Sequence, residues 1–487
     1  MSPLLVFSII AGYFLILLVI SYFTSGKADN ATFFTANKES PWFLVAFGMV
    51  GATLSGVTFI SVPGEVGNSN WTYLQFVMGN MVGYGVIALI LIPLFYKLNL
   101  ISIYEYLRNR FGQKAYLTGS SFFIISQTIG ASFRLFLAAL VLQIAFFDTF
   151  EIPFFVTVLT TILLIWLYTF RGGIKTIVWT DTLQTTFLLL AVIISMYIIL
   201  NHLELSILQM VKVVSESKMS DIFEWNWRSD RNFFKTFLAG IFITIAMNGL
   251  DQNVMQKNLT IKRTKDAQKN ILWFAITFFI ATVLFLTLGI LLYKFAFDTG
   301  ITIPDSTDDL YPMLALNHFG IAAGIVFLLG ITAAAFSSAD SALTALTTSF
   351  CVDILDLPSR KAKGQQKTRL AVHLGFTALM FCVIMVFNQI NDSSVVNAVF
   401  KVAGFTYGPL LGLFSFGLLS KKQVKDKFVP LICIISPIIC VILDLNSATW
   451  FYGYSFGFEI LLVNALLTCF GLFMIRKSTI SKNNYGT

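Results

Sequence analysis

The chain is poor in charged residues and in the side chains that bind transition metals. Only 12% of its 487 residues are charged, and its three histidines and five cysteines show no metal-ligand spacing. It contains neither the phosphate-binding loop motif of nucleotide hydrolases nor the His-Glu-x-x-His pattern of zinc hydrolases. These absences argue against a soluble domain and leave no candidate catalytic residues, so we do not expect an enzyme.

Apolar residues dominate the chain instead. It is 56% hydrophobic, with 50 phenylalanines and a mean hydropathy of +0.79. Apolar runs of about 20 residues have the length of a helix that crosses a lipid bilayer. The sequence therefore predicts an all-α integral membrane protein with about thirteen transmembrane helices, near 3–23, 42–63, 72–97, 117–147, 152–169, 176–200, 233–255, 270–296, 320–350, 369–389, 394–418, 428–446 and 455–475.

The net charge of +8 is spread unevenly over the predicted connections between these helices. Alternate connections hold 25 of the 33 lysines and arginines, whereas the opposite connections hold six and carry acidic residues such as Asp305, Asp308 and Asp309. Basic residues gather in the cytoplasmic connections of membrane proteins. The pattern predicts a multi-pass protein of the cell membrane with its N-terminus outside and its C-terminus in the cytoplasm. It also explains the charge without nucleic-acid binding.

Two predicted spans contain residues that interrupt helices. The span within 42–67 contains Gly48, Gly51, Gly56 and Pro63-Gly64, and the span within 233–257 contains Gly240 and Asn248-Gly249. Glycine weakens a helix by about 1 kcal/mol relative to alanine. Interrupted spans at matching positions in two halves indicate an inverted repeat of the kind that transporters use. The alternative is that the glycines only permit close helix packing. We predict an extra helix and a cytoplasmic connection in 1–41, a first half with an outer connection in 42–232, a second half in 233–418, and two further helices with a short tail in 419–487.

A run of polar side chains, Ser337-Ser338-Ala339-Asp340-Ser341, lies inside an otherwise apolar predicted span. An ionisable residue at membrane depth costs roughly 2.5–3.5 kcal/mol, which makes it a candidate functional residue. Ser337, Asp340 and Ser341 share one face of a helix, and a cluster of oxygen atoms suits a hard cation. The alternative is that each hydroxyl bonds to a carbonyl one turn earlier in the helix.

Two other ionisable residues within predicted spans bear on the function. Asp181 lies about five residues, roughly 8 Å, into its span, in the same cytoplasmic half as Asp340, so we expect the two carboxylates to approach each other. Arg134 lies about 17 residues, roughly 26 Å, along its helix, too far to extend easily to the inner surface. It either binds an anionic substrate or balances a carboxylate on a neighbouring helix.

Several motifs together resemble the sodium:solute symporter family over nearly the whole chain. They are Gly-Gly-Ile-x-x-x-x-Trp-Thr-Asp-x-x-Gln at 172–184, the serine pair at 337–338, Tyr-Glu-Tyr-Leu-Arg-Asn-Arg-Phe-Gly at 104–112 and Gly-Pro-Leu-Leu-Gly at 408–412. The resemblance implies a leucine-transporter-like core of five plus five inverted helices, with one helix before it and two after. It also implies a sodium site formed by the backbone carbonyls of Gly51, Leu54 and Ala334 and the hydroxyls of Ser337 and Ser338.

Around the first interrupted helix, the chain is most similar to sialic-acid-transporting members of that family. This similarity implies substrate contacts from Thr53, Ser55 and Thr58, and from Arg134 to a substrate carboxylate, with Gln75 and Asn80 as weaker candidates. It also implies a second sodium site at Asp181, Ser337, Asp340 and Ser341. Asp340 departs from the serine expected at its position, and it either strengthens a cation site or pairs with a basic side chain.

The sequence thus predicts a sodium-coupled symporter that imports a small organic solute, expected to be a carboxylate such as sialic acid, and that works as a monomer in the lipid bilayer. A neutral polyol, sugar or amino acid remains an alternative substrate. A channel or sensor that retains the symporter scaffold is an alternative of a different class.

Overall fold

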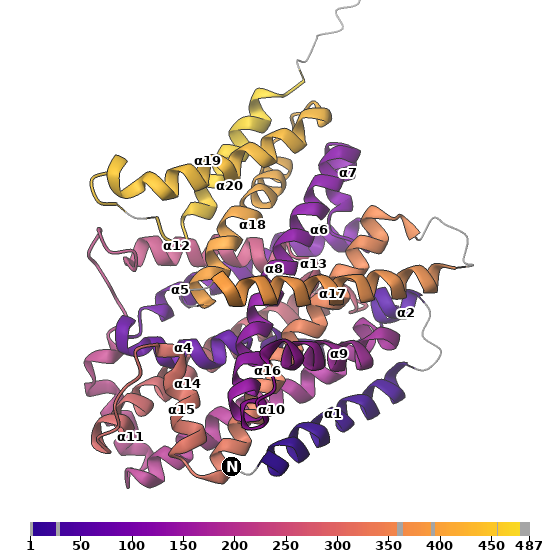
Figure 1. The fold of residues 1–487 in the computed structure, drawn as a ribbon. Helices are drawn as coiled ribbons and strands as arrows, with labels where there is room; N and C mark the ends of the chain where they lie inside the picture. The colour runs from indigo at the N-terminus through magenta and orange to yellow at the C-terminus, as the bar shows by residue number, and fades with distance from the viewer. Residues whose placement is uncertain (1–2, 26–29, 358–363, 391–394, 455, 478–487) are drawn as a thin grey trace, which may run out of the picture.

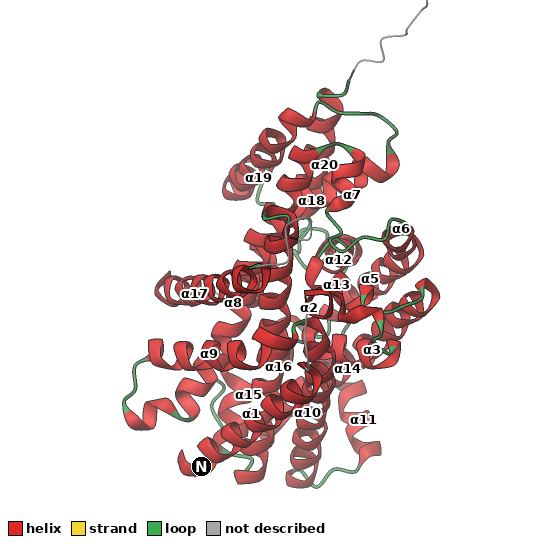
Figure 2. Cartoon of the chain, turned by 90° about the vertical axis from the view of Figure 1, so that its right-hand side faces the viewer, coloured by secondary structure: helices red, strands yellow, loops and turns green. Residues whose placement is uncertain are grey.

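The computed structural model describes residues 3–25, 30–357, 364–390, 395–454 and 456–477 (Figure 1). These residues form helices and connections, without a β-strand (Figure 2). The α-helices are α1 (Pro3–Ser25), α2 (Asn30–Thr35), α3 (Trp42–Thr53), α4 (Gly56–Ser69), α5 (Tyr73–Val86), α6 (Ile92–Lys97), α7 (Glu105–Arg110), α8 (Gln113–Ala145), α9 (Phe154–Gly172), α10 (Ile174–His202), α11 (Ile207–Glu216), α12 (Phe233–Thr244), α13 (Gln252–Leu259), α14 (Thr264–Asp298), α15 (Leu310–Asn317), α16 (Ile321–Ser349), α17 (Gln365–Ile390), α18 (Val395–Leu419), α19 (Val429–Trp450) and α20 (Ile460–Met474).

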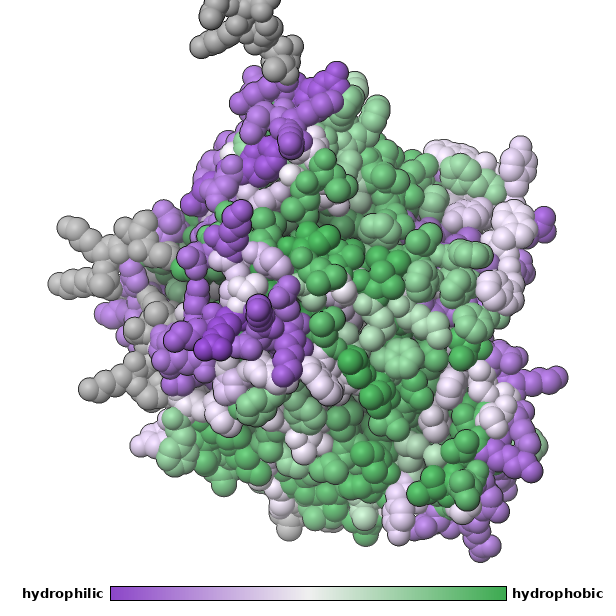
Figure 3. Space-filling view, turned by 180° about the vertical axis from the view of Figure 1, so that it is seen from behind, coloured by the Kyte–Doolittle hydropathy of each residue, from purple (hydrophilic) through white to green (hydrophobic). Residues whose placement is uncertain are grey.

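The predicted all-helical membrane architecture is confirmed. Within the described residues, nine helices are long and apolar enough to cross a membrane, and there are up to eleven such spans if each of two bent pairs counts as one. The predicted spans near 152–169 and 455–475 fall on shorter apolar helices, Phe154–Phe170 and Ile460–Met474. Apolar side chains cover a broad part of the molecular surface between more hydrophilic regions (Figure 3). A surface of this kind fits a lipid environment.

Both predicted helix interruptions are present. The axes of α3 and α4 differ by 55°, and the helix Phe233–Gly249 meets α13 at 62°. In the first break, Leu54 leaves the helical conformation with φ −75° and ψ 66°, and Ser55 is extended. In the second break, Asp251 is extended and its carboxylate caps α13 by accepting hydrogen bonds from the backbone of Asn253 and Val254. A capped helix start inside the molecule satisfies backbone donors that would otherwise be unpaired.

Glycines also let the helices approach closely, as the alternative interpretation expected. A Cβ atom at Gly48 would lie 2.9 Å from the Cβ atom of Asp181 on α10, and one at Gly51 would overlap the hydroxyl of Thr185. The backbone N–H of Gly51 donates to that same hydroxyl over 3.0 Å. The glycines of α3 therefore both precede the break and place α10 directly against it.

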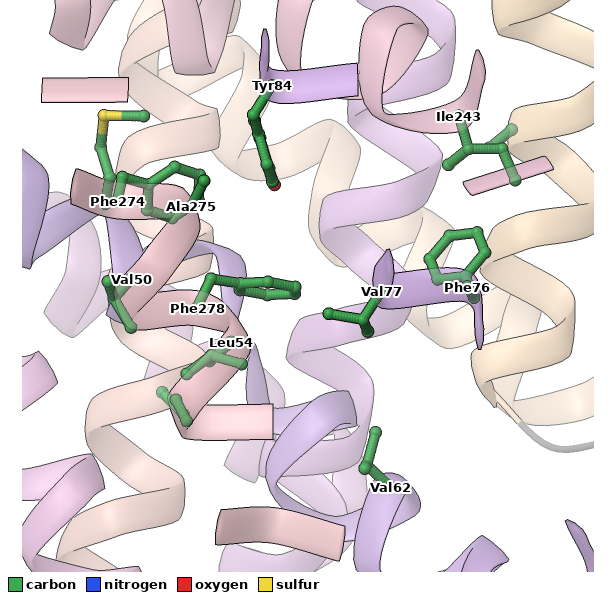
Figure 4. Packing of buried hydrophobic residues seen from close by; sticks show 14 of the residues in the cluster. Val50, Leu54, Val62, Phe76, Val77, Tyr84, Ile243, Phe274, Ala275 and Phe278 are labelled. Carbon is green, nitrogen blue, oxygen red and sulfur yellow. The ribbon is translucent and has the colours of Figure 1, made fainter. Parts of the chain in front are cut away.

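Helix α16 lies in the middle of the bundle in both ribbon views (Figures 1 and 2). Every residue from Ile331 to Ser349 is buried there. Helices α10 and α8 pack against it, and α3 and α4 contact it on either side of their break. Buried apolar side chains pack around these helices, and Tyr84 on α5 meets Phe274 on α14 edge to face, with ring centroids 5.0 Å apart (Figure 4). The polar residues of α16 are thus held at fixed positions beside the first break.

Candidate functional site

A cavity of about 470 Å³ lies between the two broken helices. This volume falls in the range of small-molecule sites, roughly 300–1,000 Å³. Charged side chains in the lining include Glu65, Asp230, Arg231, Lys235 and Glu459. Arg231 pairs with Glu65 over 3.1 Å, and both side chains are about two-fifths exposed. The cavity therefore opens beside the connection that precedes α12.

The break between α3 and α4 places three of the predicted substrate-binding residues in the cavity lining. Thr53 is the last residue of α3, Ser55 is the extended residue in the break, and Thr58 lies in the first turn of α4. Because the chain leaves the helix here, backbone polar groups lose their intrahelical partners. One of them, the carbonyl of Ala52, accepts a hydrogen bond of 3.1 Å from Ser338 on α16.

Arg134 on α8 also lines the cavity. Its Nε donates to the carbonyl of Gly130 over 2.9 Å, and one terminal nitrogen donates to the hydroxyl of Ser338 over 3.4 Å. Within the described part of the chain, no carboxylate lies within ion-pair distance of this guanidinium. A guanidinium carries five N–H donors, so most of its hydrogen-bonding capacity is not used by these two contacts.

The two weaker candidates have different positions. Asn80 lines the cavity on the wall between α5 and α12. Gln75 does not belong to the cavity lining. Its amide is buried, donates to the carbonyl of Arg231 over 3.1 Å and accepts from the backbone N–H of Glu224. Gln75 therefore anchors the connection before α12 to the start of α5.

The residues predicted for the first sodium site lie on two helices in contact. Gly51 and Leu54 are at the end of α3, whereas Ala334, Ser337 and Ser338 are in the buried middle of α16. The hydrogen bond from Ser338 to Ala52 joins the two helices at the break. Ser337 points its hydroxyl to Asp181 on α10, where it donates to Oδ1 over 2.5 Å. Hydroxyls, carbonyls and a carboxylate thus lie together beside one helix break, and such oxygen atoms are the ligands that hard cations prefer.

The residues predicted for the second sodium site are buried, with Asp181 and Asp340 both at most 1% exposed. Asp340 accepts hydrogen bonds from Tyr168 over 2.8 Å and from Ser341 over 3.2 Å. Asp181 also has a basic partner. Lys257 on α13 donates to its Oδ2 over 2.6 Å. The predicted alternative of an ion pair with a basic residue therefore occurs at Asp181, whereas the described contacts of Asp340 are hydroxyl groups.

Three functional candidates were missed from the sequence. Lys257 was counted with the cytoplasmic connections, although its side chain is only 3% exposed and lines the cavity. Asp251 also lines the cavity and accepts a hydrogen bond from Tyr407 on α18. Gln127 presents an amide nitrogen with no hydrogen-bond partner among the described residues, and it belongs to the same lining. The signal for the first two was the second helix break, because Asp251 lies in that break and Lys257 lies in the short helix α13 that follows it.

Comparisons with known proteins show the family of this chain. A family model described as "Sodium:solute symporter family" matches residues 33–426. The sodium/sialic acid symporter NanT of Aliivibrio fischeri is 26% identical over 446 residues, which cover 89% of this chain and 86% of the relative. The sodium/sialic acid symporter SiaT of Proteus mirabilis is 24% identical over 465 residues, with coverage of 92% and 91%.

Two solved structures share the fold. One is described as the substrate-bound outward-open state of a Na⁺-coupled sialic acid symporter, and it matches with a TM-score of 0.81 at 20% identity, covering 97% of this chain and 98% of the other. The other is a closed conformation of Mhp1, a nucleobase-cation-symport-1 family transporter, with a TM-score of 0.55 at 12% identity and coverage of 92% and 94%. The predicted leucine-transporter-like fold class is thereby confirmed.

Proposed function

Because this chain belongs to the sodium:solute symporter family and is a sodium-coupled symporter, we propose that its second cargo is a small hydroxylated carboxylate such as sialic acid. The observation that carries the proposal is the guanidinium of Arg134, which lines the cavity without a carboxylate partner in the described part of the chain. A guanidinium fork binds a carboxylate through two parallel charge-assisted hydrogen bonds. The two relatives named as sialic acid symporters support the same class of substrate.

The rest of the lining suits a substrate with several hydroxyl groups. Thr53, Ser55, Thr58 and Asn80 contribute polar side chains to one cavity. Within the described residues, the amide nitrogen of Gln127 and the amide oxygen of Asn253 have no hydrogen-bond partner, although both residues line the cavity. A buried polar group without a partner is costly, so these groups favour a ligand that bonds to them.

The first sodium ion is proposed to bind at the hydroxyls of Ser337 and Ser338 and the carbonyls of Gly51, Leu54 and Ala334. Support comes from the break after Thr53, which frees carbonyls next to α16, and from the direct hydrogen bond between Ser338 and the carbonyl of Ala52. Sodium, as a transported ion, would bind here and help to hold the two halves of α3–α4 in one orientation to α16.

A second sodium ion is proposed at Asp181, Ser337, Asp340 and Ser341. At 100 mV each inward positive charge yields roughly 2.3 kcal/mol, and a tenfold gradient adds about 1.4 kcal/mol. One sodium thus supplies about 3.7 kcal/mol, of which a monoanion takes back about 2.3 kcal/mol. A second sodium raises the surplus from about 1.4 to about 5.1 kcal/mol, enough for several-thousandfold accumulation.

The conformation is proposed to face outward. The open end of the cavity carries Asp230, Arg231 and Lys235 next to α12. The charge distribution assigns this connection to the outer side of the membrane, with the N-terminus outside and the C-terminus in the cytoplasm. We propose that a single chain suffices for transport, because one chain lines the cavity and supplies all the residues of both proposed sodium sites.

The proposal is tested with purified protein in proteoliposomes under an inward sodium gradient. Labelled sialic acid should accumulate above its outside concentration, and the double variant Ser337→Ala/Ser338→Ala should insert normally but lose sodium-driven uptake. Uptake that only equilibrates would indicate a channel. Accumulation of neutral sugars in preference to sialic acid would refute the proposed substrate, and unchanged sodium dependence in the double variant would refute the first sodium site.

A further inference from the structure

Lys257 is a buried lysine beside the break in the second half. It lies in the last turn of α13, whose first residue Gln252 follows the break at Asp251. Its ammonium lies 2.6 Å from Oδ2 of Asp181, and the two side chains are 3% and 1% exposed. Burying two charges in this way requires that they stay paired, since an unpaired buried charge is strongly unfavourable. The ammonium is thus a cation built into the protein and bound to Asp181.

The carboxylate that holds this ammonium is also part of the proposed second sodium site. Its other oxygen, Oδ1, accepts the hydroxyl of Ser337 over 2.5 Å. A sodium ion bound to Asp181 would lie within a few ångströms of the ammonium, in a place with little water to screen two like charges. Both oxygens of Asp181 are occupied in this structure, Oδ1 by Ser337 and Oδ2 by Lys257. A sodium ion that binds Asp181 would therefore compete with the ammonium for this carboxylate, although Asp340 supplies a second carboxylate to the proposed site.

A second buried polar side chain lies beside the same carboxylate. Gln184 lies one turn along α10 from Asp181 and is fully buried, with the hydroxyls of Tyr13 and Tyr168 beside its amide. Residues three apart on a helix lie on the same face. An amide oxygen is an additional ligand for a hard cation.

We propose that Lys257 is a tethered competitor for sodium at Asp181: its ammonium occupies the carboxylate when sodium is absent and must leave before a second sodium ion binds. This inference rests on the proposed sodium sites and adds a residue that controls them. The released ammonium can move into the polar cavity, because Lys257 lines the same cavity as Arg134. Sodium binding would then move a positive charge from Asp181 into the substrate cavity, where it favours an anionic substrate.

The competition is measured by sodium-dependent thermal stabilisation of the purified protein without substrate, at constant ionic strength with choline chloride. Lys257→Gln should lower the sodium concentration for half-maximal stabilisation by at least tenfold. Adding Asp181→Asn to this variant should remove that gain, because the carboxylate for which Lys257 and sodium compete is then absent. Lys294→Gln is the matched control, since Lys294 forms a 2.8 Å ion pair with Asp298 that is one-third exposed and outside the cavity lining.

A folded Lys257→Gln protein with unchanged or weaker sodium affinity would overturn the proposal and show that the ion pair is only structural. The first sodium site is judged separately by Ser338→Ala in a chain that keeps Lys257, because Ser338 belongs only to the first site, whereas Ser337 belongs to both. Loss of that site would leave the comparison between Lys257→Gln and the Asp181→Asn/Lys257→Gln double variant intact. A protein that does not respond to sodium in either native or Lys257→Gln form would refute both proposals.

A second measurement uses the unmodified chain, in case Lys257→Gln does not fold. A small amine-reactive ester is applied with sodium or with choline, and the modified lysines are identified by peptide mass spectrometry. Sodium should increase modification of Lys257 several-fold, since the ammonium leaves Asp181 for the cavity, whereas Lys294 should react equally in both salts. Equal modification of Lys257 with and without sodium would overturn the proposal.

Discussion

Replacing Arg134 by lysine should weaken substrate binding while preserving the charge of the cavity. In the structure, Nε of the guanidinium donates to the carbonyl of Gly130 and one terminal nitrogen donates to Ser338. The other N–H groups are available for a carboxylate. A lysine ammonium has no planar fork and cannot reproduce a two-point contact. The loss of one charge-assisted hydrogen bond corresponds to roughly 1.5–3 kcal/mol, or about 10- to 150-fold in the dissociation constant.

The assay is calorimetric titration of sialic acid into purified protein at saturating sodium. A substrate analogue whose carboxylate is esterified should bind the unmodified protein about as weakly as sialic acid binds Arg134→Lys. The variant should discriminate little between acid and ester, since the two changes remove the same interaction. Arg228→Lys is the control, because Arg228 lies over the ring of Trp227 and outside the cavity lining.

Two results would refute this reasoning. If Arg134→Lys binds sialic acid as tightly as the unmodified protein, the carboxylate is bound elsewhere and the anionic substrate loses its main support. If Arg134→Lys unfolds, or loses sodium-induced stabilisation without substrate, the guanidinium is a structural element of the contact between α8 and α16. Retained sodium stabilisation with weakened substrate binding is the expected outcome.

Two further predictions concern α16 and α5. Asp340→Asn should lower the Hill coefficient of sodium-driven uptake toward one, because it removes a carboxylate from the proposed second site. A coefficient of one in the unmodified protein would leave a second coupled sodium unsupported. Gly79→Ala should destabilise the protein by roughly 1–3 kcal/mol, because a Cβ atom there would overlap the backbone carbonyl of Phe237 on α12. Gly85→Ala on the same helix has open space at Cβ and should leave the thermal unfolding midpoint unchanged or slightly raised.

The fold was largely predictable because membrane insertion requires each spanning helix to be about 20 residues long and mostly apolar, and both properties are visible in the sequence. The position of the first break was less predictable. Pro63 lies inside α4, whereas the helix breaks at Leu54 and Ser55. The break depends on contacts that a local pattern does not contain, including the fit of Gly51 against Thr185 on α10. Local composition therefore located the broken segment but not the residues at which it breaks.

The pairing of Asp181 with Lys257 was missed for a geometric reason. Counting residues from the end of a straight helix places Lys257 near the aqueous surface. The chain turns by 62° before α13, so its last turn runs across the interior instead of out of it. The two residues are 76 positions apart, and only the tertiary structure brings their side chains to 2.6 Å. Assigning a basic residue to the aqueous surface from its position in the sequence works for straight spans and fails where a span is broken.

Ser338 would connect the cavity to the proposed first sodium site. Its hydroxyl donates to the carbonyl of Ala52 and accepts from Arg134, which leaves one lone pair for a further ligand, since a hydroxyl has one donor and two acceptor positions. A sodium ion on that lone pair would share one oxygen atom with the guanidinium, and the two positive charges would repel each other. A substrate carboxylate on Arg134 neutralises the guanidinium and reduces that repulsion. If both ligands bind as proposed, sodium and an anionic substrate would therefore strengthen each other's binding, and by linkage the effect would be equal in both directions. A neutral substrate would leave the repulsion in place, so the shared serine favours coupled transport of an anion.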